Sequence, residues 1–144
     1  MWLWHGTYDM FYKDIKKEGV IKPGINRDTH SIMLDNLINT VAKANLRGNC
    51  VYLSHDIDAM DGFDKSFRIS TSNIDISRLF VADNGVLDHI IASYGTDAAV
   101  VHAHRYIMSY MSFNDFLKQK DTYLEMYYPE FLYFGEINIP TRSK

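Results

Sequence analysis

Apolar and polar positions follow two different periods along this chain, and they predict a mixture of strands and helices. Segment 2–5 is apolar and aromatic, which predicts a strand that Gly6 and Thr7 interrupt. Apolar residues then recur at helical spacing over 9–19 and over 31–46, and a glycine closes each segment. The first third of the chain therefore predicts a strand, a helix, a short extended piece at Val20-Ile21 with a turn at Pro23-Gly24, and a second helix.

The rest of the chain predicts short strands that frame helical insertions. The final strand is stopped by Pro140, and the first and last strands lie at opposite ends of the sequence. This order is typical of an α+β fold and not of the regular alternation in a doubly wound sheet. The predicted strands span 51–54, 67–80 and 131–139, and the predicted helices span 56–63, 86–94 and 97–117.

Length and composition favour one globular domain over residues 1–144. Hydrophobic residues make up 47% and charged residues 23%, and no repeat or Gly-, Ser- or Pro-rich linker divides the chain. The net charge of −3 provides no global basic field for nucleic acid. A local basic stretch remains, which is either a solvated helix face or a contact for phosphates: Lys13, Lys16, Lys17, Lys22 and Arg27.

Several classes of protein are disfavoured by what the sequence lacks. No apolar run approaches the roughly 20 residues of a membrane span, and the N-terminus has no signal-peptide pattern, so we expect action in the cytosol of the producer or of a target host. Cys50, the single cysteine, sits in an apolar stretch and is expected to be a buried structural thiol. His102 and His104 point to different faces of a helix, so we expect no metal site.

Three separated segments carry residues suited to chemistry. The first is the strand end His5-Gly6-Thr7, followed directly by a helix. The second is Cys50-Val51-Tyr52-Leu53-Ser54, and the third is Tyr128-Pro129-Glu130-Phe131-Leu132-Tyr133, which opens the last strand. Their order and spacing resemble the ADP-ribosyltransferase superfamily, in its His-Tyr-Glu branch, which includes the diphtheria-toxin-like and poly-ADP-ribose polymerase enzymes and small bacterial and phage transferases.

The resemblance spans nearly the whole chain and implies an ADP-ribosyltransferase-like split β-sheet with helical insertions. It implies that NAD is the substrate and that ADP-ribose passes to an unknown macromolecular acceptor, either protein or nucleic acid. Carried over residue by residue, it implies an adenosine-ribose contact for His5 and a nicotinamide contact for Gly6. Tyr52 becomes the stacking residue, Ser54 and Thr7 become further NAD contacts, and Glu130 becomes the catalytic carboxylate.

The chemistry of the reaction suits these residue types. Breaking the bond between nicotinamide and ribose passes through an oxocarbenium-like cation, which a positioned carboxylate stabilises. A glutamate at the start of an edge strand and an aromatic ring on a central strand supply the charge and the stacking surface. Glycine allows close approach of the backbone to a ligand because it has no Cβ atom.

The assignment of the carboxylate leaves alternatives. Glu130 opens an apolar strand that reaches a proline, as the catalytic residue of this superfamily does, so it ranks first. Glu136 follows Gly135 and ranks second, and Glu125 ranks third.

Two other functions remain open. One is an RNA 2′-phosphotransferase of the same fold, although Tyr52 stands where that activity calls for a histidine. The other is a catalytically inactive binding or inhibitor module, which becomes the better interpretation if His5, Tyr52 and Glu130 do not share a pocket.

Overall fold

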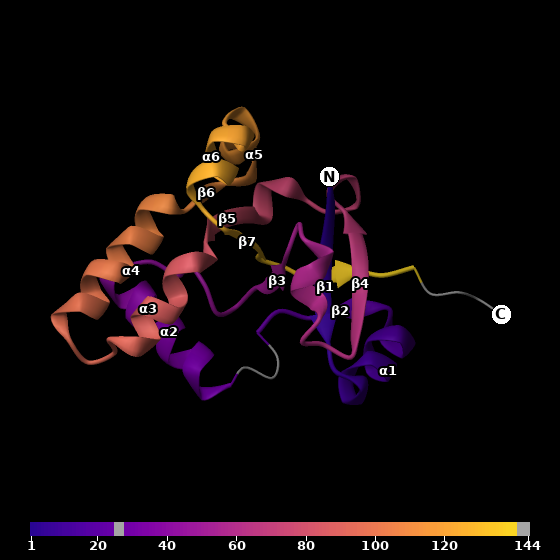
Figure 1. Ribbon diagram of the computed structural model, residues 1–144. Helices are drawn as coiled ribbons and strands as arrows, with labels where there is room; N and C mark the ends of the chain where they lie inside the picture. Colours follow the sequence, from indigo (N-terminus) through magenta and orange to yellow (C-terminus); the bar gives the residue numbers. More distant parts are fainter. Residues whose placement is uncertain (25–27, 141–144) are drawn as a thin grey trace.

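The protein combines helices with small antiparallel sheets, as seen in a computed structural model that describes residues 1–24 and 28–140 (Figure 1). The strands are β1 (Trp2–Thr7), β2 (Val20–Ile21), β3 (Val51–Leu53), β4 (Lys65–Ser70), β5 (Leu79–Asp83), β6 (Met111–Ser112), β7 (Pro129–Tyr133) and β8 (Ile137–Asn138). The α-helices are α1 (Asp9–Glu18), α2 (Thr29–Ala42), α3 (Leu87–Ala92), α4 (Asp97–Ser109), α5 (Phe113–Lys118) and α6 (Lys120–Met126). Four 3₁₀ turns are η1 (Ile57–Met60), η2 (Thr71–Asn73), η3 (Ile76–Arg78) and η4 (Asn84–Val86).

Two strand systems meet at the centre of the molecule. The larger sheet has the order β3-β7-β5-β6, with Tyr52 opposite Leu132 and Ala82 opposite Glu130. The smaller one pairs β1 with β4. A bridge between Trp4 and Ser54 joins the two systems, with two backbone hydrogen bonds of 2.7 and 2.9 Å. The chain thus brings its first strand alongside β3.

The larger sheet separates two hydrophobic cores. Side chains alternate between the faces of a strand, so Phe131 and Tyr133 enter one core with Phe113 and Phe116, while Leu132 enters the other. This second core is covered by α2, α3 and α4, which Figure 1 shows gathered on one side of the molecule. Glu130 and Tyr52 share the face of Leu132.

Much of the predicted secondary structure is confirmed. Strands begin the chain and occupy 51–53, and a helix follows β1 as expected; the predicted interruption at Gly6 and Thr7 was wrong, since both residues pair with β4 within β1. Gly19 ends α1 in the left-handed conformation with φ of 72°, which a glycine adopts without strain. Cys50 is a buried free thiol, as predicted, and burial raises its pKa to about 11. The mixed α and β class is confirmed, and the split-sheet fold stays a proposal.

Other predicted elements were wrong. Segment 67–80 is two strands, because the Ser70 hydroxyl and the Asp75 carboxylate accept backbone hydrogen bonds and form turns between them. The predicted helix over 97–117 stops at Ser109, and the hydroxyl of Ser112 caps a new one.

Two expectations about the strands also need correction. The predicted strand over 131–139 is divided into β7 and β8, which join different sheets. Strand β7 lies between β3 and β5, so Glu130 opens an interior strand and not an edge strand. Tyr52 lies on β3, which is the outermost strand of the larger sheet. Hydrophobic pattern cannot separate these positions, because strand order depends on pairing between distant segments.

Candidate functional site

A cavity of about 750 Å³ lies where the two strand systems meet. A volume of this size suits a ligand as large as a dinucleotide fragment or a drug. Its lining contains the six residues that the sequence predicts to contact NAD: His5, Gly6, Thr7, Tyr52, Ser54 and Glu130. Glu125 and Glu136 are exposed and do not line it.

His5 is held against β3 by a hydrogen bond. Its Nδ1 atom lies 3.0 Å from the backbone carbonyl oxygen of Tyr52. A carbonyl only accepts, so Nδ1 carries the hydrogen. Burial lowers the pKa of the imidazole, which the hydrogen bond to Tyr52 only partly counteracts. His5 is therefore neutral at pH 7, with Nε2 left as an acceptor.

Gly6 lies directly under an aromatic ring. A Cβ atom at this position would come within 2.3 Å of the ring of Phe63, so only glycine fits beneath it. Phe63 also lines the cavity and contacts Tyr8, with 5.3 Å between ring centroids. The Phe63 ring, which is 37% exposed, thus occupies the space over the Gly6 backbone.

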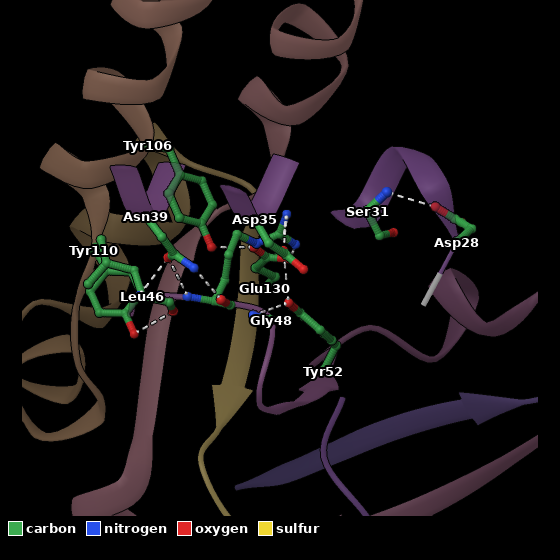
Figure 2. Close-up of polar contacts among 11 residues, drawn as sticks. Asp28, Ser31, Asp35, Asn39, Leu46, Gly48, Tyr52, Tyr106, Tyr110 and Glu130 are labelled. Carbon is green, nitrogen blue, oxygen red and sulfur yellow. Dashed lines mark hydrogen bonds and ion pairs between the residues drawn. The ribbon is translucent and has the colours of Figure 1, made fainter. Parts of the chain in front are cut away.

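Tyr52 is fixed at its hydroxyl. This oxygen accepts a hydrogen bond of 2.9 Å from the backbone N–H of Gly48 and donates one of 3.4 Å to Asp35 (Figure 2). The guanidinium of Arg47 lies 5.1 Å from the centre of its ring, within the range of a cation–π contact. The ring is therefore held by the hydrogen bonds at its hydroxyl and by the contact of Arg47 with one face.

Glu130 is buried and has two partners. The hydroxyl of Tyr106 on α4 donates a hydrogen bond of 2.5 Å to Oε2, and Nη2 of Arg47 lies 3.4 Å from Oε1. Arg47 also forms an ion pair of 3.4 Å with Asp35 on α2. Two carboxylates therefore share one guanidinium, and the cluster of Asp35, Arg47 and Glu130 has a formal net charge of −1.

The backbone around Arg47 is clamped by side chains from the helices. The amide of Asn39 receives hydrogen bonds from the N–H groups of Leu46 and Arg47 and donates one to the carbonyl of Arg47. The hydroxyl of Tyr110 donates to the carbonyl of Leu46 at 2.8 Å. Figure 2 shows these side chains converging on the segment that leads into β3. The loop is thus built to deliver Arg47 to the cavity.

The electrostatics of this cluster follow from burial. Burial alone would lower the pKa of the Arg47 guanidinium. The Glu130 carboxylate and other neighbours raise the pKa by more than burial lowers it, so it lies above the ordinary value. Burial, together with Glu130, raises the pKa of Tyr106 well above its usual range. Arg47 is charged and Tyr106 is neutral at any working pH.

Ser54, Thr7 and Lys22 occupy other parts of the lining. The Ser54 hydroxyl accepts a hydrogen bond from the backbone N–H of Asp56, and Thr7 is buried. Lys22 is the one residue of the predicted basic stretch that lines the cavity within the described part of the chain, and it lies 3.3 Å from Glu18. Arg27 lies outside the described residues.

Charge along the lining is mostly negative among the residues that the structure describes. Four carboxylates and two cations line the cavity. The carboxylates are Asp14, Glu18, Asp28 and Glu130, and the cations are Lys22 and Arg47.

Sequence reasoning missed three residues of the site. Arg47 and Tyr106 contact Glu130, and Phe63 covers Gly6. Neither partner of Glu130 gave a local signal, because Arg47 lies in a polar segment before the apolar run of 50–53 and Tyr106 lies within a helix.

The described residues contain neither a metal-binding cluster nor a membrane-spanning helix. There, no group of three or more His, Cys, Asp or Glu side chains is placed to hold a metal ion. No helix in the same ranges combines the length and apolarity of a bilayer span. His102 instead stacks on His89, with ring centroids 5.2 Å apart.

Comparisons with known proteins add no relative. No protein-family model, no curated protein and no solved structure matches this chain.

Proposed function

We propose that this protein is a mono-ADP-ribosyltransferase that cleaves NAD and transfers ADP-ribose to a macromolecule. The observation that carries the proposal is the shared cavity. Residues from three distant segments, expected to bind NAD on the basis of motif order, line one hollow of about 750 Å³. The arrangement of β1 and β4 beside the β3-β7-β5-β6 sheet is compatible with a split-sheet ADP-ribosyltransferase fold.

In this proposal each residue has a defined task. The ring of Tyr52 stacks on the nicotinamide, and its hydroxyl, tied to Gly48 and Asp35, fixes the ring plane. Neutral His5 accepts a hydrogen bond from a ribose hydroxyl through Nε2. Phe63 supplies a second aromatic face next to Gly6 and shifts to admit the ligand.

Glu130 provides the charge for bond cleavage. As positive charge develops on the ribose, the net negative charge of the Asp35–Arg47–Glu130 cluster stabilises it. Lys22 provides a cation for the pyrophosphate. Its pair with Glu18 is exposed on both sides, 44% and 51%, and such pairs contribute little, so a phosphate can replace the carboxylate.

A second candidate function, an inactive binding module, is favoured by one observation. Glu130 already has two partners, and a carboxylate shared with an arginine opposes a developing cation less strongly than a free one. Such a protein would bind NAD or another ligand in the same cavity without cleaving it.

One experiment separates these functions. The purified protein is incubated with a host-cell lysate and two NAD samples, labelled in the nicotinamide or in the adenine. The proposal expects released nicotinamide and an adenine label that becomes macromolecular, sensitive to either protease or nuclease. Binding of NAD without any nicotinamide release would favour the binding module, and the absence of both would reject the transferase and an NAD-binding module alike.

A further inference from the structure

We propose that Arg47 is the positioning residue of this site: it holds Glu130 as an oriented anion and supports the ring of Tyr52. The inference rests on the proposed function in one respect, namely that Glu130 is the carboxylate that acts on NAD. The contacts that support the inference are all between side chains of the protein and do not depend on a ligand.

The first observation is that one guanidinium connects the two chemical elements of the site. Nη2 of Arg47 lies 3.4 Å from Oε1 of Glu130, and the guanidinium carbon lies 5.1 Å from the centre of the Tyr52 ring. On its other side it lies 5.6 Å from the ring of Tyr106, which is itself bonded to Oε2 of Glu130. Arg47 therefore contacts both the carboxylate and the stacking ring.

The second observation is that stability does not explain this residue. Arg47 is 5% exposed, and its Nε and Nη1 atoms make no hydrogen bond with the described residues, although Nη1 faces Asp35. Burying a charge with incomplete hydrogen bonding is unfavourable, and apolar residues of similar size usually serve a core as well or better. A buried arginine with unused donors is therefore better explained by the site than by packing.

The third observation is that hydrogen bonds from other side chains, and not the guanidinium, hold the backbone of the loop at Leu46 and Arg47. Asn39 and Tyr110 fix the chain from Leu46 to Arg47, and Gly48 follows with φ of 114°, where a Cβ atom would lie 3.2 Å from Asp35. Replacing the Arg47 side chain leaves these contacts in place. The effect of a substitution on Glu130 can therefore be separated from collapse of the loop.

Removing the charge of Arg47 leaves Glu130 beside groups that do not neutralise it. A buried carboxylate without its cation resists ionisation, so activity that needs the anion should shift to higher pH. The titratable groups around Glu130 are Arg47 from the loop, Asp35 from α2, Cys50 just before β3, Tyr52 within β3, Tyr106 from α4, Tyr110 just after α4 and Tyr123 from α6.

The test compares Arg47→Gln and Arg47→Lys with Arg78→Gln. Arg78 is a matched control, because it pairs with Asp75 on the surface at 60% exposure. For NAD cleavage, Arg47→Gln should lower kcat by on the order of 10²-fold with a smaller change in KM, as displacement of a reacting group does. The acid limb of its pH–rate profile should move up by about one pH unit or more.

Arg47→Lys keeps the charge without the planar fork, so it should lower kcat while leaving the acid limb near that of the wild type. Arg78→Gln should change neither. An Arg47→Gln protein that is folded, with wild-type kcat and an unmoved acid limb, would overturn the proposal. If Arg47→Gln does not fold, the Arg47→Lys result decides, since unchanged kcat there would also overturn it.

A readout without turnover keeps this inference distinct from the proposed function. In protein labelled with ¹³C, the Glu130 carboxyl signal is identified by its loss in Glu130→Gln. Its titration midpoint should lie at higher pH in Arg47→Gln than in the wild type. If the wild type cleaves no NAD but this shift is present, the proposed function fails and the coupling of Arg47 to Glu130 stands. An unshifted midpoint rejects the coupling whatever the activity.

Discussion

Glu130 and Phe131 are neighbours in β7, yet the two faces of the sheet give them opposite surroundings. Phe131 is fully buried against rings of Phe113 and Phe116, with centroids 6.3 and 5.4 Å away. Glu130 faces a tyrosine hydroxyl, an arginine and the cavity. One face is packed for stability, whereas the other holds buried charge that stability alone does not require. Buried charge on one face of a strand whose other face is packed with aromatic rings marks the place where function is to be sought.

The largest effect is expected on the apolar face. Phe131→Ala should lower the free energy of unfolding by about 3–5 kcal/mol, because it leaves a cavity among aromatic side chains that cannot collapse. Urea unfolding of the variant and the wild type measures this. A loss below about 1 kcal/mol would mean that this face is not the rigid core described.

On the cavity face, changes at Tyr52 should affect binding more than folding. Tyr52→Ala should weaken NAD binding by roughly 1–3 kcal/mol, as loss of one stacked ring does. Tyr52→Phe keeps the ring and should bind nearly as well, while losing about 1 kcal/mol of stability because the hydroxyl no longer bonds Gly48 and Asp35. Calorimetry showing equal, large losses of affinity for both variants would contradict stacking.

Gly6 and Phe63 test the close contact between β1 and the turn that leads into β4. Gly6→Ala should destabilise the protein by about 1–3 kcal/mol, because the new Cβ atom overlaps the Phe63 ring. In the double variant Gly6→Ala/Phe63→Ala this overlap is gone, so the combined loss should be smaller than the sum of the single losses. Additive losses in urea unfolding would show that the two positions do not touch.

The smallest effect concerns pH and His5. Its pKa is lowered in the folded protein, so the unfolded chain binds the proton more readily and stability falls as pH drops through the ordinary value of about 6.5. Between pH 7.5 and 5.5 the wild type should therefore lose more stability than His5→Gln. His104→Gln, on the exposed side of α4, is the control. Equal losses in the wild type and His5→Gln would reject the buried, neutral imidazole.

Local signals in the sequence were sufficient for part of this fold. The existence of a first strand, the helix ended by Gly19 and the strand at Val51–Leu53 follow from periodicity and glycine placement, whereas the extension of β1 through Gly6 and Thr7 does not. The turns at Ser70 and Asp75 were missed, because side-chain bonds to the backbone compete with a strand whose apolar pattern continues through them.

The candidate site was predicted only as far as its motifs. His5, Tyr52 and Glu130 come to one cavity because β1 joins β3 and β3 pairs with β7. The partners of Glu130 could not be predicted in the same way. Arg47 and Tyr106 reach it from a loop and a helix whose positions depend on packing of α2 and α4, for which the sequence carries no local signal.

The central claim is that Glu130 acts in NAD cleavage, and the most direct test is turnover and affinity measured together in Glu130→Gln and Glu136→Gln. Glutamine keeps the size of the side chain and one acceptor oxygen for its two donors, Tyr106 and Arg47, but removes the charge. For Glu130→Gln the account predicts NAD affinity close to that of the wild type and turnover lower by on the order of 10²–10³, the effect of losing one preorganised electrostatic contact. Exposed Glu136 should tolerate the same change in both measurements. Near-normal turnover in Glu130→Gln would contradict the account, and a collapse confined to Glu136→Gln would move the chemistry out of the cavity described.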